Sequence, residues 1–348
     1  RNTQYAIRDL LAALGERARC DEPLKRHTTI RIGGPADLYV EASTARELAD
    51  LVLLARQHHV PHLVMGSGSN MLVSDAGLRG LVIANRARRI EFQVEGSSFQ
   101  ADKDNGLVEL EPETFKLQAE TILAWAESGV TLPSLALACI ERGYANLEWA
   151  AGVPGTVGGA VVGNAGAHGG DVACDLVTAT ILNGDGVARD WSNEELGFGY
   201  RTSRLKIANR KSQTPALALE RSAGASVAIC RPVVLAAAFR LRTSTREELE
   251  ARVADFAGRR RRRQPPGATM GSVFKNPTGD YAGRLLEAAG LKGSQVGQAQ
   301  ISPAHANFIV NLGDATAADV KALIDLARDK VRAQFGVELE LEIELIGE

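Results

Sequence analysis

The sequence predicts an α+β protein organised in three successive segments. Residues 1–85 follow a strand–helix–strand–strand pattern, which is typical of a small α/β domain. Residues 86–240 mix short alternating strands with helices, and residues 241–336 contain two longer helices. The terminal segment 337–348 is a predicted strand and a candidate to return to the first segment.

Each element of the first segment has a local signal. Residues 37–41 are strand-like, and Thr44 and Glu47 have the spacing of a capping box at a helix start. Short apolar strands are predicted at 63–65 and 81–83. The helix is expected to bury one stripe of apolar side chains: Leu48, Leu51, Val52 and Ala55.

In the middle segment we predict helices at 117–128 and 132–142, and we interpret residues 207–231 as a surface excursion. In the third segment a helix is predicted from Arg246 to Ala257, ending at Gly258.

A further helix is capped by Thr316 and stopped by Gly336. Its predicted buried stripe is Val320, Leu323, Ile324, Ala327 and Val331. The alternation from Val337 to Leu345 then predicts a strand with one apolar face and one glutamate face. The glutamates are Glu338, Glu340, Glu342 and Glu344.

Composition excludes several classes of protein. Among 348 residues, 45% are hydrophobic and 24% charged, which argues against a disordered chain. The net charge of −2 gives no general reason to expect a nucleic-acid partner. No apolar run approaches a membrane span, and the first residues lack the apolar core of a signal peptide. Four cysteines without a C-x-x-C pair predict reduced thiols in a cytoplasmic protein.

Glycine is unusually frequent, with 35 residues, and it is concentrated in two stretches that could bind an anion. Residues 66–70 follow a strand, but Met71 stands where a Rossmann fingerprint needs its third glycine. Residues 152–159 form the second stretch. Glycine-rich turns expose consecutive N–H groups to a phosphate, so two of them could hold a pyrophosphate; the alternative is two tight turns.

Other site types lack their motifs. The sequence has no P-loop, no H-E-x-x-H and no G-x-S-x-G, and no metal site is predicted. The basic run 259–263 is short and lies at a helix end, so we interpret it as a solvated or anion-contacting terminus. Residues 271–277 bring a hydroxyl, a cation and an amide together, which is a modest signal by itself.

Taken in order, several segments closely resemble the UDP-N-acetylenolpyruvoylglucosamine reductase family. The resemblance extends from about residue 27 to residue 347. Its blocks are Thr28–Ala36, Gly66–Asp75, Gly152–Gly159 with Asn164–Gly166, Phe198–Lys206, Gly271–Pro277, Ala282–Gly293 and Ser302–Asn311.

The resemblance implies a three-domain flavoprotein with the non-Rossmann FAD-binding fold of the vanillyl-alcohol-oxidase/PCMH type plus a C-terminal substrate domain. Its FAD-binding subdomains would be residues 1–85 and 86–240, and its substrate-binding domain residues 241–336. It implies that NADPH reduces bound FAD and that UDP-N-acetylglucosamine enolpyruvate then accepts hydride at C3 and a proton at C2. The product, UDP-N-acetylmuramate, is a precursor of peptidoglycan.

The resemblance also assigns roles to residues. Ser272 would donate the proton, Arg201 would stabilise charge near the carboxylate, and Glu342 matches the catalytic glutamate. The cofactor residues would be Gly66, Ser67, Gly68, Ser69, Asn70, Pro154, Gly155, Thr156, Val157, Gly158, Gly159, Asn164 and Gly166. Tyr200, Lys275, Asn276 and Arg263 would bind the substrate.

Two features depart from the family pattern. His168 stands where many members have tyrosine, and the excursion at 207–231 has no tyrosine that could cover the substrate, as in the subclass without that loop. The alternatives are a flavin oxidase of the same cofactor fold and a regulator without catalysis. We expect a monomer or weak oligomer.

Overall fold

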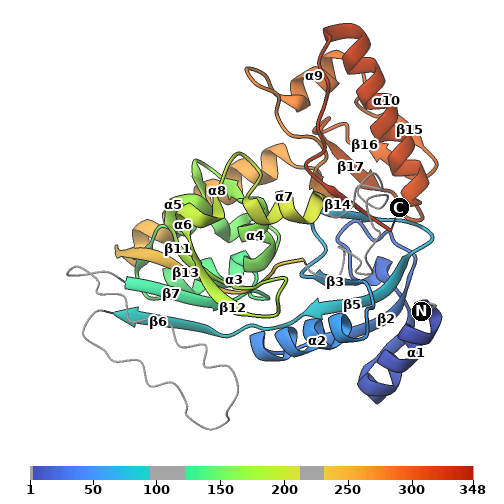
Figure 1. Cartoon of the computed structure of the whole chain (residues 1–348). Coiled ribbons are helices and arrows are strands. Elements are labelled where there is room, and N and C mark those ends of the chain that lie inside the picture. Colours follow the sequence, from blue (N-terminus) through green and yellow to red (C-terminus); the bar gives the residue numbers. More distant parts are fainter. Residues whose placement is uncertain (1–2, 95–121, 212–230, 348) are drawn as a thin grey trace.

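The computed structural model describes residues 3–94, 122–211 and 231–347 (Figure 1). Residues 117–121 of one predicted helix, and residues 212–230 of the predicted excursion, lie outside the described residues. The described remainder of that excursion belongs to helix α7 (Arg204–Lys211) and to the approach to β13. The three larger sheets are separate in Figure 1, and the third stands apart from the second.

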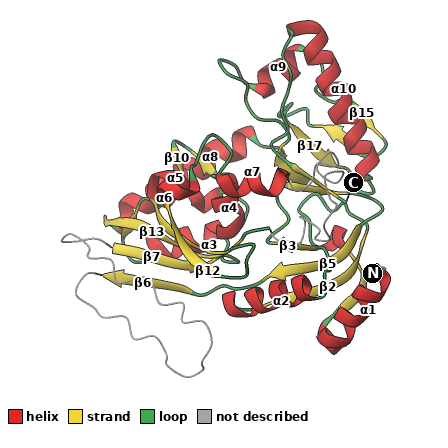
Figure 2. Ribbon diagram, in the orientation of Figure 1, coloured by secondary structure: helices red, strands yellow, loops and turns green. Residues whose placement is uncertain are grey.

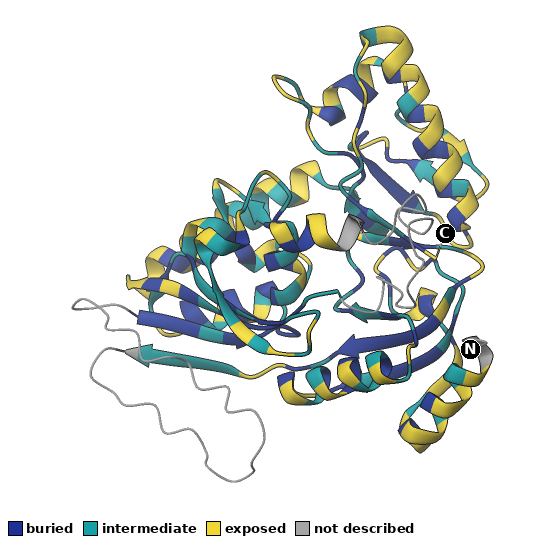
Figure 3. Ribbon diagram, in the orientation of Figure 1, coloured by how far each residue is buried: buried dark blue, intermediate teal, exposed yellow. Residues whose placement is uncertain are grey.

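The first sheet has the order β1-β2-β5-β3, formed by Arg19–Pro23, Pro35–Ala42, Leu78–Asn85 and His62–Met65. Strands β2 and β3 both run parallel to β5, as a strand–helix–strand unit requires. Helices α1 (Thr3–Leu14) and α2 (Ala45–Gln57) pack on one face. The predicted cap is confirmed, because Thr44 Oγ1 accepts from Glu47 N at 3.1 Å. The predicted stripe of α2 is buried, whereas its other face is exposed (Figure 3).

The second sheet is antiparallel, in the order β12-β11-β13-β7-β6. Its strands are Ala188–Ser192, Leu176–Leu182, Val233–Thr243, Ile122–Glu127 and Ile90–Val94. The helix predicted at 117–128 is therefore wrong where the chain is described, since residues 122–127 form β7. Residues 122–126 are apolar, and β7 is almost continuously buried between two neighbouring strands. A short apolar run of that kind has no period that separates strand from helix.

Helices cover the second sheet, and α4 (Val157–Gly163) packs on β13 and β7 (Figure 2). The helix expected at 132–142 is confirmed as α3 (Leu132–Ile140). Helix α8 (Arg246–Arg263) packs on the 3₁₀ segment η3 (Glu148–Gly152) and on α3. The predicted end at Gly258 is wrong, because the arginines after it continue the helix until Gln264 precedes Pro265.

The third sheet has the order β14-β17-β16-β15, formed by Ala268–Ser272, Phe308–Asn311, Ala299–Ile301 and Gln295–Val296. Helices α9 (Ala282–Ala288) and α10 (Ala317–Phe335) pack with it. The prediction for α10 is confirmed: Thr316 and Asp319 form a capping box, Gly336 ends the helix with φ 68°, and the predicted stripe is buried.

Shorter elements complete the described chain. They are η1 (Gly15–Arg17), η2 (Leu24–Arg26), β4 (Met71–Val73), β8 (Tyr144–Ala145), β9 (Gly166–Ala167), β10 (Gly170–Asp171), α5 (Val172–Asp175), α6 (Asn193–Leu196) and β18 (Glu344–Ile346).

The continuous strand predicted at 337–345 is wrong. Only β18 is a strand in this region, and it pairs in parallel with β4. Before it, Leu341 makes one isolated bridge with Phe274. The chain instead bends at residues 342–343. Its main chain bonds in turn to Lys275, Val273 and Asn70 as it crosses between sheets. We refer to residues 337–347 as the C-terminal segment.

The N-terminal part of the chain is tied to the second and third sheets by apolar cores. Leu182 and Val233 of the second sheet pack into the core beneath β2 and β5, and Ile30 and Leu72 pack into the core of α10. Hydrogen bonds reinforce both junctions. Asp75 accepts from the N–H groups of Ala317 and Ala318 at the start of α10. Glu127 Oε1 accepts from Ala45 N at 2.7 Å, and its Oε2 accepts from Arg89 N at 2.8 Å.

Replacing Glu127 with alanine is expected to lower the free energy of unfolding by about 2–4 kcal/mol, because two main-chain donors lose a buried, charged acceptor. Urea unfolding of the FAD-loaded protein, at an unchanged m-value, measures this. Glu250→Ala is the control: Glu250 pairs with Arg246 on the exposed surface of α8, where the expected change is within about 0.5 kcal/mol. Equal losses in the two variants would contradict the assignment.

Candidate active site

The first glycine-rich stretch, residues 66–70, is the loop between β3 and β4. Gly68 has φ +62°, in the left-handed region. In the described part of the chain, the main-chain N–H groups of residues 67–70 donate to no protein acceptor. A left-handed glycine among consecutive unbonded N–H groups forms an anion-binding nest.

The second stretch meets the first directly. A Cβ on Gly66 would lie 2.8 Å from Thr156 Cγ2 and still closer to its hydroxyl. Gly155 has φ +135°, and Ser69 Oγ is the nearest atom to its missing Cβ, at 3.6 Å. Among the described residues, the N–H groups of Gly155 and Thr156 also have no acceptor. The two loops therefore form one glycine-lined cradle that suits a pyrophosphate.

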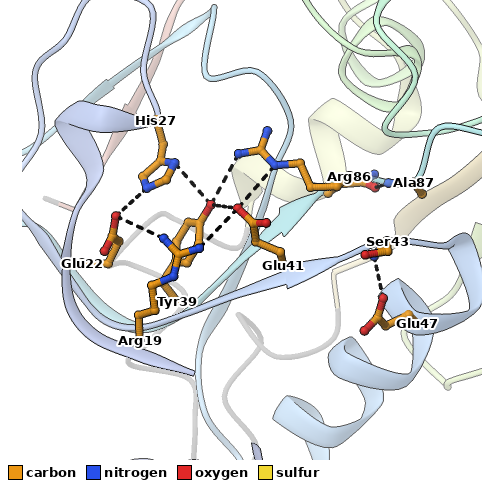
Figure 4. Close-up of polar contacts among 10 residues, drawn as sticks. Arg19, Glu22, His27, Tyr39, Glu41, Ser43, Glu47, Arg86 and Ala87 are labelled. Carbon is orange, nitrogen blue, oxygen red and sulfur yellow. Dashed lines mark hydrogen bonds and ion pairs between the residues drawn. The ribbon is translucent and has the colours of Figure 1, made fainter. Parts of the chain in front are cut away.

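A group of polar side chains surrounds His27 and Tyr39, next to the chain on which the first loop packs (Figure 4). A Cβ on Gly68 would lie 2.9 Å from Thr28 Cα, so the chain at 27–28 is the wall against which this loop packs. His27 is fixed there by Glu22, whose Oε1 lies 2.8 Å from Nε2, and by stacking on Tyr39. The Tyr39 hydroxyl donates to Glu41 at 2.9 Å. Burial, followed by the bond to Glu41, raises the pKa of Tyr39 to about 12.

Two predicted cofactor residues have contacts of a different kind. Asn164, in left-handed backbone with φ 44°, donates from Nδ2 to Gly199 O at 3.1 Å. Gly166 lies in β9, where a Cβ would be 2.7 Å from Gly170 O. In this structure Asn164 joins the end of α4 to the turn that carries Arg201, and Gly166 permits a close hairpin.

The C-terminal segment brings the candidate catalytic residues together. Glu342 N donates to Val273 O at 2.9 Å, directly after Ser272. On its other side, Asn70 Nδ2 donates to Glu342 O at 3.1 Å. The segment thus lies between the first glycine loop and the strand end that carries Ser272.

Arg201 approaches Glu342 from the second sheet's side. It lies in a turn closed by two main-chain hydrogen bonds between Gly199 and Thr202, and its φ is 55°. A non-glycine residue in this region costs about 1–3 kcal/mol and persists where the surroundings hold it. Arg201 Nε lies 2.9 Å from Glu342 Oε1, as an ion pair without hydrogen-bond alignment. The structure therefore places a guanidinium and a carboxylate side by side near Ser272.

Three alternate glutamates of the C-terminal segment each meet a cation. Glu340 pairs with Lys275 at 3.2 Å, and Glu344 pairs with Lys206 at 3.5 Å. The side chain of Glu342 is 17% exposed, against 74% for Glu340 and 28% for Glu344. Burial raises the pKa of Glu342, and the charges of Arg201, Lys206 and Lys275 oppose that rise. Of these three glutamates, Glu342 is therefore the one whose side chain is least exposed to water.

Ser272 and Asn276 line a cavity of about 450 Å³ beside α9. Tyr200 reaches this loop, because its hydroxyl accepts from Asn276 N at 3.4 Å. The rest of the lining combines charged and neutral groups: Tyr281, Gly283, Arg284, Glu287, Ala304, His305, Ala306 and Asn307. A cavity lined by both charged and neutral polar groups suits a polar ligand.

Arg263 stands apart from these candidates at the exposed end of α8. Its charge contributes to lowering the pKa of His305, after burial and Lys292, which places it within electrostatic range of the cavity. His168, the departure from the family pattern, stacks on Phe256 of the same helix with ring centroids 4.3 Å apart. Arg260 of this helix donates to Gly152 O, at the start of the second glycine stretch.

Sequence reasoning missed two buried residues of this site. Asn307 accepts from Phe274 N and donates to Phe274 O, so it pins the chain next to Ser272. Lys206 is 4% exposed and faces the C-terminal segment. Both belong to matched blocks, but neither side chain has a local pattern that indicates its partner.

Among the described residues, no cluster of three or more histidine, cysteine or acidic side chains is arranged to hold a metal ion. No helix in the described ranges is both long and apolar enough to cross a membrane.

Two family profiles match most of this chain. The profile of the FAD binding domain family matches residues 36–191, and that of the UDP-N-acetylenolpyruvoylglucosamine reductase C-terminal domain matches residues 263–346. The UDP-N-acetylenolpyruvoylglucosamine reductase of Chloroflexus aggregans is 42% identical over 94% of this chain and 97% of its own length. UDP-N-acetylenolpyruvoylglucosamine reductase 2 of Symbiobacterium thermophilum is 44% identical, over 95% and 92%.

The solved structures include a relative of similar extent. The crystal structure of the Thermus caldophilus UDP-N-acetylenolpyruvylglucosamine reductase superposes with a TM-score of 0.68 at 32% identity, covering 95% of this chain and 99% of that one. The predicted fold class is thereby confirmed, with a FAD-binding part followed by a C-terminal domain. The chain belongs to the UDP-N-acetylenolpyruvoylglucosamine reductase family.

Proposed function

We propose that Ser272, Arg201 and Glu342 carry out the chemistry of this family's reaction in this chain. That reaction is the FAD-dependent reduction of UDP-N-acetylglucosamine enolpyruvate by NADPH to UDP-N-acetylmuramate, a step of peptidoglycan precursor synthesis, and the chain is an oxidoreductase of this class. The convergence of these residues along the C-terminal segment is the observation that supports the proposal most.

The two glycine loops fit the pyrophosphate of FAD. Main-chain N–H groups at 67–70 and 155–156 would donate to its oxygens, and the absent side chains of Gly66 and Gly155 let them approach. When bound and reduced by NADPH, FAD supplies the hydride that C3 of the enolpyruvyl group receives. Asn70 would join cofactor and catalytic centre, since it belongs to the loop and also holds Glu342 O.

The reacting end of the substrate develops negative charge at C2 and its carboxylate as C3 receives hydride. Arg201 would stabilise this charge, and it would do so in a partly buried site where such interactions are strengthened. Ser272 would donate its hydroxyl proton to C2, which is basic enough at that moment to accept it. Glu342 would orient Arg201 and contribute its own carboxyl group beside the reacting carbons.

The substrate's sugar nucleotide would lie along the loop after β14. Lys275, Asn276 and Tyr200 would contact its diphosphate, where a cation and neutral donors can share two phosphate charges. Arg263 at the end of α8 would add a second cation from across the cavity. The cavity beside α9 provides room for the remainder of the nucleotide.

The decisive experiment is NADPH oxidation with and without the enolpyruvyl sugar nucleotide. We expect yellow protein, and turnover that depends on that substrate. A protein that cannot be reconstituted with FAD would exclude the proposal. Fast oxygen consumption without the sugar nucleotide would favour a flavin oxidase instead.

We also propose the division into FAD-binding residues 1–85 and 86–240 and substrate-binding residues 241–336, with the C-terminal segment returning to the first. The pairing of β18 with β4 supports that return. The cytoplasmic location and the monomeric or weakly oligomeric state are further predictions from the sequence.

A further inference from the structure

Lys206 is a buried cation beside the proposed catalytic carboxylate. It lies in the first turn of α7 and is 4% exposed. A buried charge is costly unless an opposite charge compensates it, and Glu344 Oε1 lies 3.5 Å from Nζ. This ion pair joins the second sheet's side of the site to the C-terminal segment.

Both ends of this contact are held by the main chain. Lys206 N donates to Ser203 Oγ at 3.3 Å, and Ser203 Oγ donates to Val162 O of α4 at 2.7 Å. At the other end, Glu344 N donates to Asn70 O at 3.0 Å. The ion pair therefore connects two fixed supports.

We propose that Lys206 is a positioning residue for Glu342, acting through Glu344. This inference rests on the proposed function of Glu342. Glu342 and Glu344 are two residues apart, and both side chains face the turn and the start of α7, since Glu342 pairs with Arg201 and Glu344 pairs with Lys206. Holding Glu344 against α7 keeps Glu342 facing Arg201, which lies just before α7.

The charge of Lys206 has a second effect, on the protonation of Glu342. The charged groups around Glu342 are Arg201 and Lys206 from the turn and α7, Lys275 from the loop after β14, and Glu340 and Glu344 on its own segment. Arg231 is a further cation close enough to interact with the charge of Glu344. Lys206 opposes the rise that burial causes in the pKa of Glu342. A like charge nearby favours the protonated form of a carboxyl group, so Glu344 is expected to act in the opposite sense to Lys206.

The test compares Lys206→Met and Lys206→Arg by stopped-flow measurement of the two half-reactions of the FAD-loaded protein. Lys206→Met should reduce flavin reoxidation by saturating enolpyruvyl substrate about 10- to 100-fold, because a displaced carboxylate loses its working geometry. The KM for the substrate and the rate of flavin reduction by NADPH should change little. Lys206→Arg keeps the charge and should retain most of the rate.

The pH profile separates this role from simple support of the fold. Without the Lys206 cation the pKa of Glu342 rises, so the limb that follows Glu342 should move to higher pH in Lys206→Met. Glu344→Gln removes a like charge and leaves Lys206 less neutralised, so the same limb should move to lower pH. Opposite shifts support the proposal, and shifts in one direction would overturn it.

Two further outcomes are distinct. If the wild-type protein reduces the substrate and Lys206→Met does so equally fast with an unchanged profile, this inference fails and the proposed function stands. If wild-type protein shows no substrate-dependent turnover, the proposed function itself fails. Should Lys206→Met not retain FAD, Lys206→Arg and Glu344→Gln decide: Lys206→Arg should keep the wild-type profile and Glu344→Gln should move the limb to lower pH, and an unchanged or upward-shifted limb in Glu344→Gln would overturn the proposal.

Discussion

Alanine in place of Ser272 is expected to leave the reduction of bound FAD by NADPH intact and to slow flavin reoxidation by the enolpyruvyl substrate. The loss should be about 10²–10⁴-fold, the usual contribution of a positioned proton donor. Alanine keeps the backbone of β14 and removes the one group there that would protonate C2. Stopped-flow absorbance of the flavin, recorded separately for the two half-reactions, measures both rates.

Two comparisons sharpen this result. Ser294→Ala removes a hydroxyl from the same sheet's region, outside the cavity, and should leave both half-reactions unchanged. Ser272→Cys supplies a more acidic proton and should recover part of the rate. Equal slowing of both half-reactions in Ser272→Ala would contradict the assignment of Ser272 as proton donor.

Alanine in place of Gly66 is expected to weaken FAD binding about 10- to 100-fold. The added Cβ would lie 2.8 Å from Thr156 Cγ2, and Thr156 is a β-branched residue that is 7% exposed, so it has little room to move. Overpacking of this kind costs about 1–3 kcal/mol, and here it would separate the two loops of the cradle. Fluorescence titration of the apoprotein with FAD measures the affinity.

The control for this variant is Gly163→Ala in α4, where a Cβ meets nothing within 4 Å and φ is not positive. Its FAD affinity should match that of the wild type. If Gly66→Ala binds FAD as tightly as Gly163→Ala, the contact between the two loops does not shape the cofactor site.

The sequence predicted an element correctly where its own residues mark its two ends and its buried face. Helix α10 has a capping box, an apolar stripe and a terminal glycine, and all three are found in the structure. Strand β7 lacks such signals, because its burial on both sides comes from neighbours distant in sequence. In α8, Gly258 predicted the end of the helix, but the arginines that follow continue it to Arg263.

The sequence predicted the candidate site only in part. Family motifs marked Ser272, Arg201 and Glu342, but alternation alone could not separate Glu342 from Glu340 and Glu344. Their difference in exposure arises from contacts with three other parts of the chain. For the same reason Lys206 was overlooked, since its partner is more than a hundred residues away in the sequence.

The shared apolar cores have a consequence for how the chain can be divided. The core of the third sheet includes Ile30, Ile32 and Leu72, which the N-terminal part of the chain supplies. Strand β18 likewise has its partner, β4, in that part. A fragment cut at residue 240 would therefore leave apolar surface bare on both pieces, so the C-terminal part of this enzyme is not an exchangeable module and must be expressed and engineered together with its N-terminal support.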